Sequence, residues 1–143
     1  MAAHTSRDDN RPDSAIVGFV ARARLVRAGA PVTFEPLPGG VSSDIWLARA
    51  GNATFCVKRA LPRLRVTAEW RAPIERNSKE AGWIKAVAAF MPEAVPALLA
   101  EDAGAGMFAM EYLPPQSFEG WKGQLQRGHV ICDSQAVCEH ARS

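Results

Sequence analysis

The sequence predicts an α+β fold in which a mainly antiparallel sheet of about five strands carries one long helix across it. Short apolar segments with strand-like alternation occupy residues 32–37, 45–49 and 54–60. A helical pattern over residues 73–90 follows them, and two more apolar segments come after it. Together these elements predict the α+β class.

Size and charge exclude several classes of protein. The chain has 143 residues, of which 48% are hydrophobic and 22% charged, and this suits one globular domain with its own core. The net charge of +2 is too small to predict binding to nucleic acid. No apolar stretch reaches the ~18 residues that a membrane-spanning helix needs, so we expect no membrane partner. The polar start lacks the apolar segment of a signal peptide, and we expect a cytoplasmic protein.

The N-terminal part predicts an arm and a helix. Residues 1–13 offer almost nothing to bury, which is typical of a flexible arm. Asp13 or Ser14 can cap a helix, and Gly29 can end it. Apolar residues recur along this helix at helical spacing: Ile16, Phe19, Val20, Ala23 and Val26. We expect it to pack on the rest of the domain.

The first three strands are separated by two different turns. The loop between the first and second strands contains Gly39 and Gly40. Gly51 and Asn52 predict a two-residue hairpin between the second and third strands, because both residue types tolerate positive φ. The third strand includes Lys58. Its side chain shares a face with that of Cys56, because side chains alternate along a strand.

The long helix is expected to begin near Pro73 and to end before Pro92, since proline suits a helix start and blocks continuation. Its apolar face comprises Ala81, Ile84, Val87, Ala88 and Met91. Glu80 lies at the edge of that face, where a carboxylate requires a cationic partner. A fourth strand is predicted over residues 95–100, and a fifth over residues 107–113, ended by two prolines.

These elements predict a phosphate site. The two glycines allow the backbone to approach phosphate oxygens, and Ser42 and Ser43 can add hydroxyl donors. The Lys58 ammonium can bind the same oxygens. Glu80 is the expected partner that orients Lys58, and Glu75 is the alternative.

The order of elements resembles the N-terminal lobe of the kinase-like phosphotransferases, in particular the aminoglycoside phosphotransferase and choline kinase family. Five segments carry the resemblance: Gly39 to Leu47, Phe55 to Lys58, Arg76 to Ala81, Val95 to Leu99 and Met110 to Leu113. The resemblance extends over roughly residues 32–125. It implies a small nucleotide-binding lobe over residues 14–115, followed at 116–143 by the exit from the hinge and the start of a large lobe.

The resemblance also implies a function, which is the transfer of phosphate from ATP, with Mg²⁺, to a hydroxyl of an aminoglycoside-like or choline-like molecule. The implied nucleotide-binding residues are Gly39, Gly40, Ser42, Ser43, Cys56, Lys58, Glu80, Met110, Glu111 and Leu113. Among these, Cys56 and Met110 would lie against the adenine. Glu111 and Leu113 would present a backbone carbonyl and amide to the adenine edge.

Two features depart from the family pattern. The loop has two adjacent glycines in place of the three spaced glycines of protein kinases. The family's catalytic Asp and its later magnesium-binding Asp have no counterpart, since His129 and Asp133 have the wrong spacing and come too early. We therefore expect a fragment with no catalytic residue and no metal ligand, which is inactive alone and acts on its small-molecule acceptor only in a full-length form.

Two other functions are compatible with the sequence. One is a non-catalytic module that binds a nucleotide or a partner, and the other is a small α+β interaction domain whose lysine and glycines are incidental. Cys132 and Cys138 have no zinc spacing, and a metal site with His129 and His140 is a remote alternative.

Overall fold

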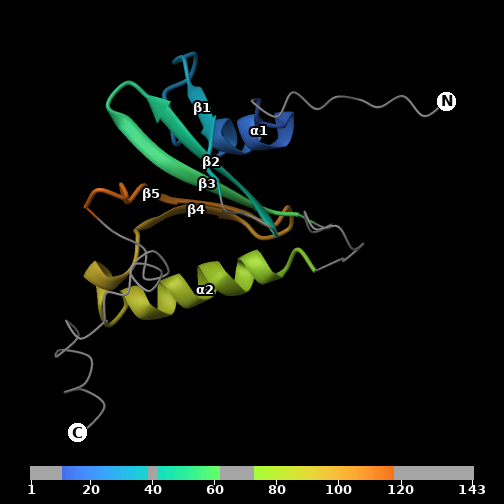
Figure 1. Cartoon of the computed structure of the whole chain (residues 1–143). Helices are drawn as coiled ribbons and strands as arrows, with labels where there is room; N and C mark the ends of the chain where they lie inside the picture. Colours follow the sequence, from blue (N-terminus) through green and yellow to red (C-terminus); the bar gives the residue numbers. More distant parts are fainter. Residues whose placement is uncertain (1–10, 39–41, 62–72, 118–143) are drawn as a thin grey trace, which may run out of the picture. The chain divides into compact units, whose positions relative to one another are not determined.

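The computed structural model describes residues 11–38, 42–61 and 73–117 (Figure 1). The chain divides into two units, Met1–Tyr112 and Leu113–Ser143. All helices and strands of the described residues lie in the first unit. Residues 1–10 of the predicted arm, residues 39–41, residues 62–72 and residues 118–143 lie outside the described residues. The last of these ranges contains most of the predicted start of a large lobe.

The sheet has five strands: β1 (Thr33–Pro36), β2 (Ser43–Ala50), β3 (Ala53–Ala60), β4 (Leu98–Asp102) and β5 (Met107–Glu111). Their order is β1-β2-β3-β5-β4, and every neighbouring pair is antiparallel. The hairpin between β2 and β3 turns at Gly51, whose φ is 58°. The predicted α+β class with an antiparallel sheet is confirmed.

The two faces of β3 meet different helices. Phe55 and Val57 belong to one core cluster with α1 (Ser14–Arg22), and the register places Cys56 and Lys58 beside Met110 and Phe108 on the other face. Phe108 packs against α2 (Arg76–Ala88). Figure 1 shows α2 running along one side of the sheet. Lys58 therefore projects toward the side of the sheet that carries α2.

Helix α1 is shorter than predicted, and Gly29 is not its end. The helix closes after Arg22, and Arg24 adopts a left-handed conformation with φ 54°. The Leu25 N–H then donates to the Val20 carbonyl (3.3 Å), and the Arg24 N–H donates to the Ala21 carbonyl (3.1 Å). These two bonds form a Schellman motif, which satisfies the last carbonyls of a helix.

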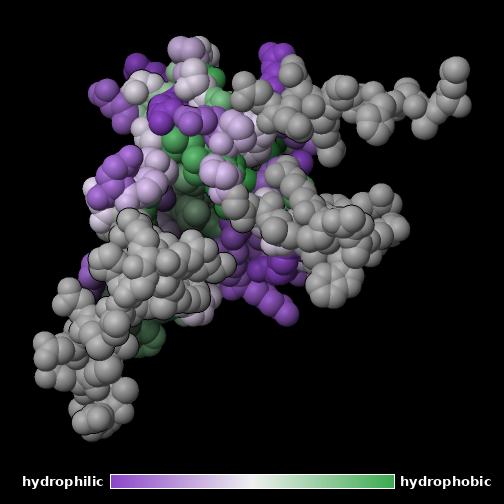
Figure 2. Space-filling model, in the orientation of Figure 1, coloured by the Kyte–Doolittle hydropathy of each residue, from purple (hydrophilic) through white to green (hydrophobic). Residues whose placement is uncertain are grey.

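Helix α2 also differs from the prediction at its ends, since it begins at Arg76 and not near Pro73. It ends at Ala88, so Met91 is not part of its apolar face and is 53% exposed. Asn77, Ala81 and Ile84 are its buried residues. Apolar atoms are visible near the C-terminal end of α2 (Figure 2), where Phe90 is also exposed.

The last two strands are displaced from their predicted bounds. β4 begins later than predicted and includes Glu101 and Asp102, which pair with Phe108 and Met107. β5 ends at Glu111, two residues before the predicted end at Leu113. No helix in the described part of the chain is long and apolar enough to cross a membrane.

Candidate functional site

Lys58 and Glu80 form an ion pair between β3 and α2. The Lys58 Nζ lies 2.7 Å from Glu80 Oε1 and 2.7 Å from Glu80 Oε2. The Lys58 side chain is 18% exposed and that of Glu80 40% exposed. The predicted pair is confirmed. The alternative partner Glu75 instead precedes the first residue of α2 as an exposed N-cap.

The fold explains why these two side chains meet. Lys58 lies directly opposite Phe108 in the β3–β5 register, and Phe108 is fully buried against α2. Ala81 and Ile84 are the buried contacts of α2 in that cluster. Glu80 immediately precedes Ala81, so it lies on the flank of the buried face and reaches the end of the lysine side chain.

Within residues 11–38, 42–61 and 73–117, the ion pair leaves one N–H donor of Lys58 available. An ammonium group has three N–H donors, and Glu80 accepts two of them. The site therefore has a partly exposed ammonium that is held in place by a carboxylate and can donate to another oxygen anion. This donor set fits a phosphate group.

Cys56 and Met110 are apolar neighbours of Lys58 on the same face of the sheet. They are paired in the β3–β5 register, and Cys56 shares the strand face of Lys58. Cys56 is only 4% exposed, and this burial raises the pKa of its thiol to about 11. Cys56 therefore remains a neutral thiol near pH 7 and serves as an apolar side chain rather than a nucleophile.

The glycine loop connects the antiparallel strands β1 and β2. Gly39 and Gly40 lie outside the described residues, so their predicted role stays a prediction. The Ser42 carbonyl accepts a hydrogen bond from the Leu61 N–H (3.0 Å). Ser43 is the first residue of β2 and is only 4% exposed. Its hydroxyl is therefore less accessible to a ligand than the hydroxyl of a loop serine.

The strand, loop and helix order that carries this ion pair corresponds to a known family. A sequence model of the phosphotransferase enzyme family matches residues 33–137. The chain belongs to this family. The match begins at the first residue of β1 and includes both Lys58 and Glu80. No curated protein is significantly similar to the chain.

The family resemblance implies adenine contacts at the end of β5, and these stay predictions. Glu111 is the last residue of β5, and its N–H donates to the Ala97 carbonyl (2.8 Å). Its carboxylate also accepts from the Ala97 N–H (3.2 Å). Leu113 is the first residue of the second unit.

Two residues at the start of α2 make contacts that the sequence does not predict. Arg76 donates hydrogen bonds to three backbone carbonyls, and Asn77, which is 1% exposed, donates from Nδ2 to the Gly106 carbonyl (2.9 Å). Both resemble ordinary polar residues of a first helical turn. Apart from the Pro73 carbonyl, their partners are backbone atoms distant in sequence, so the residue pattern contained no signal for these contacts.

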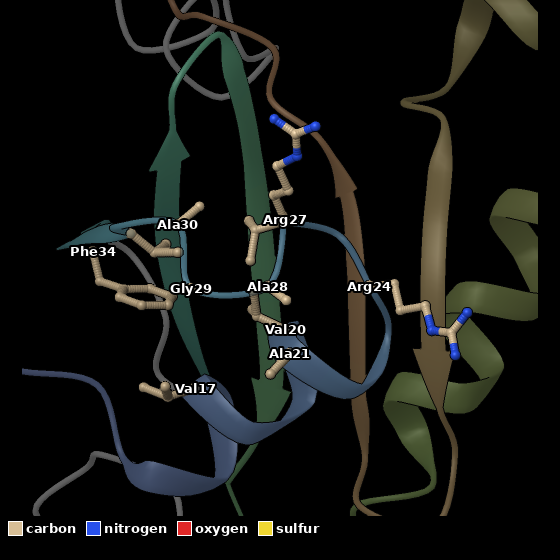
Figure 3. A pocket seen from close by; sticks show the side chains of 11 residues that line it. Val17, Val20, Ala21, Arg24, Arg27, Ala28, Gly29, Ala30 and Phe34 are labelled. Atoms are coloured by element: carbon tan, nitrogen blue, oxygen red, sulfur yellow. The ribbon is translucent and has the colours of Figure 1, made fainter.

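A cavity of about 600 Å³ lies away from the ion pair (Figure 3). Its walls come from α1, the segment that follows it and β1, including Val17, Val20 and Phe34. Lys58 projects from the other face of the sheet. Figure 3 shows the guanidinium groups of Arg24 and Arg27 directed away from the cavity. Because polar groups converge at Lys58 and not here, we place the candidate site at the ion pair.

Metal-binding side chains do not cluster in the described part of the chain. Within residues 11–38, 42–61 and 73–117, no group of three or more His, Cys, Asp or Glu side chains could hold a metal ion. We therefore assign no step to a metal.

Proposed function

We propose that the first unit of this phosphotransferase binds ATP. The bound ATP would donate its terminal phosphoryl group to a hydroxyl of a small molecule similar to an aminoglycoside or to choline. The observation that carries the proposal is the bidentate Lys58–Glu80 pair. The Lys58 ammonium lies 2.7 Å from both carboxylate oxygens, and its third donor has no partner among the described residues. In kinase-like enzymes, a lysine held by a helix glutamate binds the phosphates of the nucleotide.

Each residue then has a defined task. Lys58 binds oxygens of the phosphate chain, and Glu80 fixes its ammonium group in place before the nucleotide arrives, so that little reorganisation is needed. The partly buried Met110 offers apolar surface for the base, with the buried Cys56 beside it on the same face. When bound, ATP supplies the phosphoryl group. The base that orients the acceptor hydroxyl and the ligands for magnesium would come from outside the described residues.

The first test is nucleotide binding by the full chain. We expect Lys58→Met to weaken ATP binding by at least ~10-fold in titration calorimetry, because a charge-assisted hydrogen bond contributes roughly 1.5–3 kcal/mol. Lys85→Met is the matched control. Lys85 is also in an ion pair, with Glu101, but its side chain is 57% exposed on α2. We expect Lys85→Met to bind ATP like the wild type.

A second measurement separates binding from chemistry. The chain is incubated with labelled ATP, magnesium and a panel of amino-sugar and choline-like acceptors. We expect binding without transfer, because the described residues supply no acceptor base and no magnesium site. If the wild type does transfer phosphate and Lys58→Met abolishes the transfer, the whole reaction takes place in this chain. Absence of ATP binding by the folded wild type would contradict the proposal.

A further inference from the structure

Arg76 joins three separate backbone segments of the lobe. It is the first residue of α2. Its Nη1 donates to the Pro73 carbonyl (2.8 Å), and its Nη2 donates to the Leu61 carbonyl (2.8 Å) and to the Ser42 carbonyl. Ser42 lies at the end of the glycine loop, and Leu61 immediately follows β3. One guanidinium group therefore connects the loop, the lysine strand and the glutamate helix.

These contacts lie close in sequence to both members of the ion pair. Arg76 precedes Glu80 by four residues, which is about one turn of the same helix. Leu61 follows Lys58 by three residues, and its N–H donates to the Ser42 carbonyl that Arg76 also binds. A displacement of the loop end would therefore act directly on the Arg76 contacts and on the start of α2.

The chemistry of the side chain suits this task. Arginine presents five N–H donors in a rigid planar fork, whereas lysine presents a single compact charge. Among the described residues, the hydrogen-bond partners of Arg76 are all backbone carbonyls. Carbonyl groups do not neutralise the guanidinium, so its positive charge remains beside the end of the loop.

We propose that Arg76 is a positioning residue for nucleotide phosphates. It holds Ser42, the end of β3 and the start of α2 in a fixed relation, so that the Lys58–Glu80 pair meets the phosphate chain in one position. This inference rests on the proposed function, because it assumes that the site takes ATP. It adds a residue outside the nucleotide-binding set that the family resemblance implies.

The test compares ligands with and without phosphates. ATP, ADP and adenosine are titrated into the full chain, as wild type, Arg76→Ala and Arg76→Lys. We expect both variants to bind ATP and ADP at least ~10-fold more weakly, because the phosphates then meet donors that are no longer held in place. Adenosine affinity should not change. Arg49→Ala is the control, since Arg49 forms an exposed ion pair with Glu35 on β1.

The outcomes are distinct. An equal loss for ATP and adenosine together with a lower Tm would mean that Arg76 only stabilises the fold, and would overturn the inference. If Arg76→Lys binds ATP with wild-type affinity, positive charge alone explains the role of this position, and the inference is also overturned. If Arg76→Ala does not fold, Arg76→Lys carries the test. If the wild type binds ATP no better than adenosine, the proposed function itself fails, and this is read from the wild type alone.

Discussion

Gly106 sets the position of α2 against the sheet, and we expect Gly106→Ala to destabilise the chain strongly. Gly106 lies in the turn between β4 and β5 with φ 63°, where an L-residue is strained. A Cβ atom there would lie 3.1 Å from the Ile74 Cβ and 3.2 Å from the Ile74 carbonyl oxygen. The backbone at Ile74 or at the turn must then move.

The magnitude follows from two costs. A left-handed conformation costs an L-residue roughly 1–2 kcal/mol. The Gly106 carbonyl also accepts hydrogen bonds from Asn77 Nδ2 and from the Ala60 N–H, both at 2.9 Å. Weakening these bonds adds about 1–2 kcal/mol. The sum of about 2–4 kcal/mol corresponds to a Tm lowered by roughly 8–16 °C in a chain of this size.

Gly51→Ala is the matched control for this measurement. Gly51 has a similar φ of 58°, but a Cβ atom there meets nothing within 4 Å. It should therefore incur only the backbone cost of roughly 1–2 kcal/mol. Thermal unfolding followed by circular dichroism at pH 7 compares the two variants. Equal losses of Tm would refute the reasoning, because the contacts of Gly106 with Ile74 and Asn77 would then contribute nothing.

Two further changes test other parts of the fold. The pKa of Asp13 is lowered from 3.8 to about 2, mainly by the hydrogen bond from Arg59 and then by that from the Ala15 N–H. The contribution of Asp13 to the stability of the fold is therefore complete above about pH 4 and is lost as the pH falls toward 2. Asp13 is 42% exposed, so Asp13→Asn should remove at most about 1 kcal/mol, and unchanged acid unfolding would contradict this. Gly82→Ala, at an exposed position inside α2 with open space, should raise the free energy of unfolding by about 0.5–1 kcal/mol; a lower Tm would count against it.

The sheet and the ion pair could be predicted from the sequence because local patterns determine them. The alternation in β3 placed Cys56 and Lys58 on one face, and Gly51 and Asn52 located the hairpin. The apolar stripe through Ala81 and Ile84 placed Glu80 at the edge of the buried face. Each of these signals depends on residues a few positions apart.

The remainder depends on backbone geometry that the residue types do not reveal. The end of α1 could not be predicted, because an arginine adopts the left-handed position that glycine usually takes. The role of Arg76 could not be predicted either. Its partners are carbonyls of Ser42, Leu61 and Pro73, and every residue has a carbonyl.

The two-sided burial of β3 makes the chemistry of Lys58 depend on strand register. Phe55 and Val57 are buried on the face of α1, whereas Lys58 faces Glu80. A slip of β3 by one residue would turn Val57 toward Glu80 and would drive the lysine ammonium into the apolar core. An insertion or deletion within β3 should therefore abolish the site and the fold together, so this strand can change its side chains during evolution but not its length.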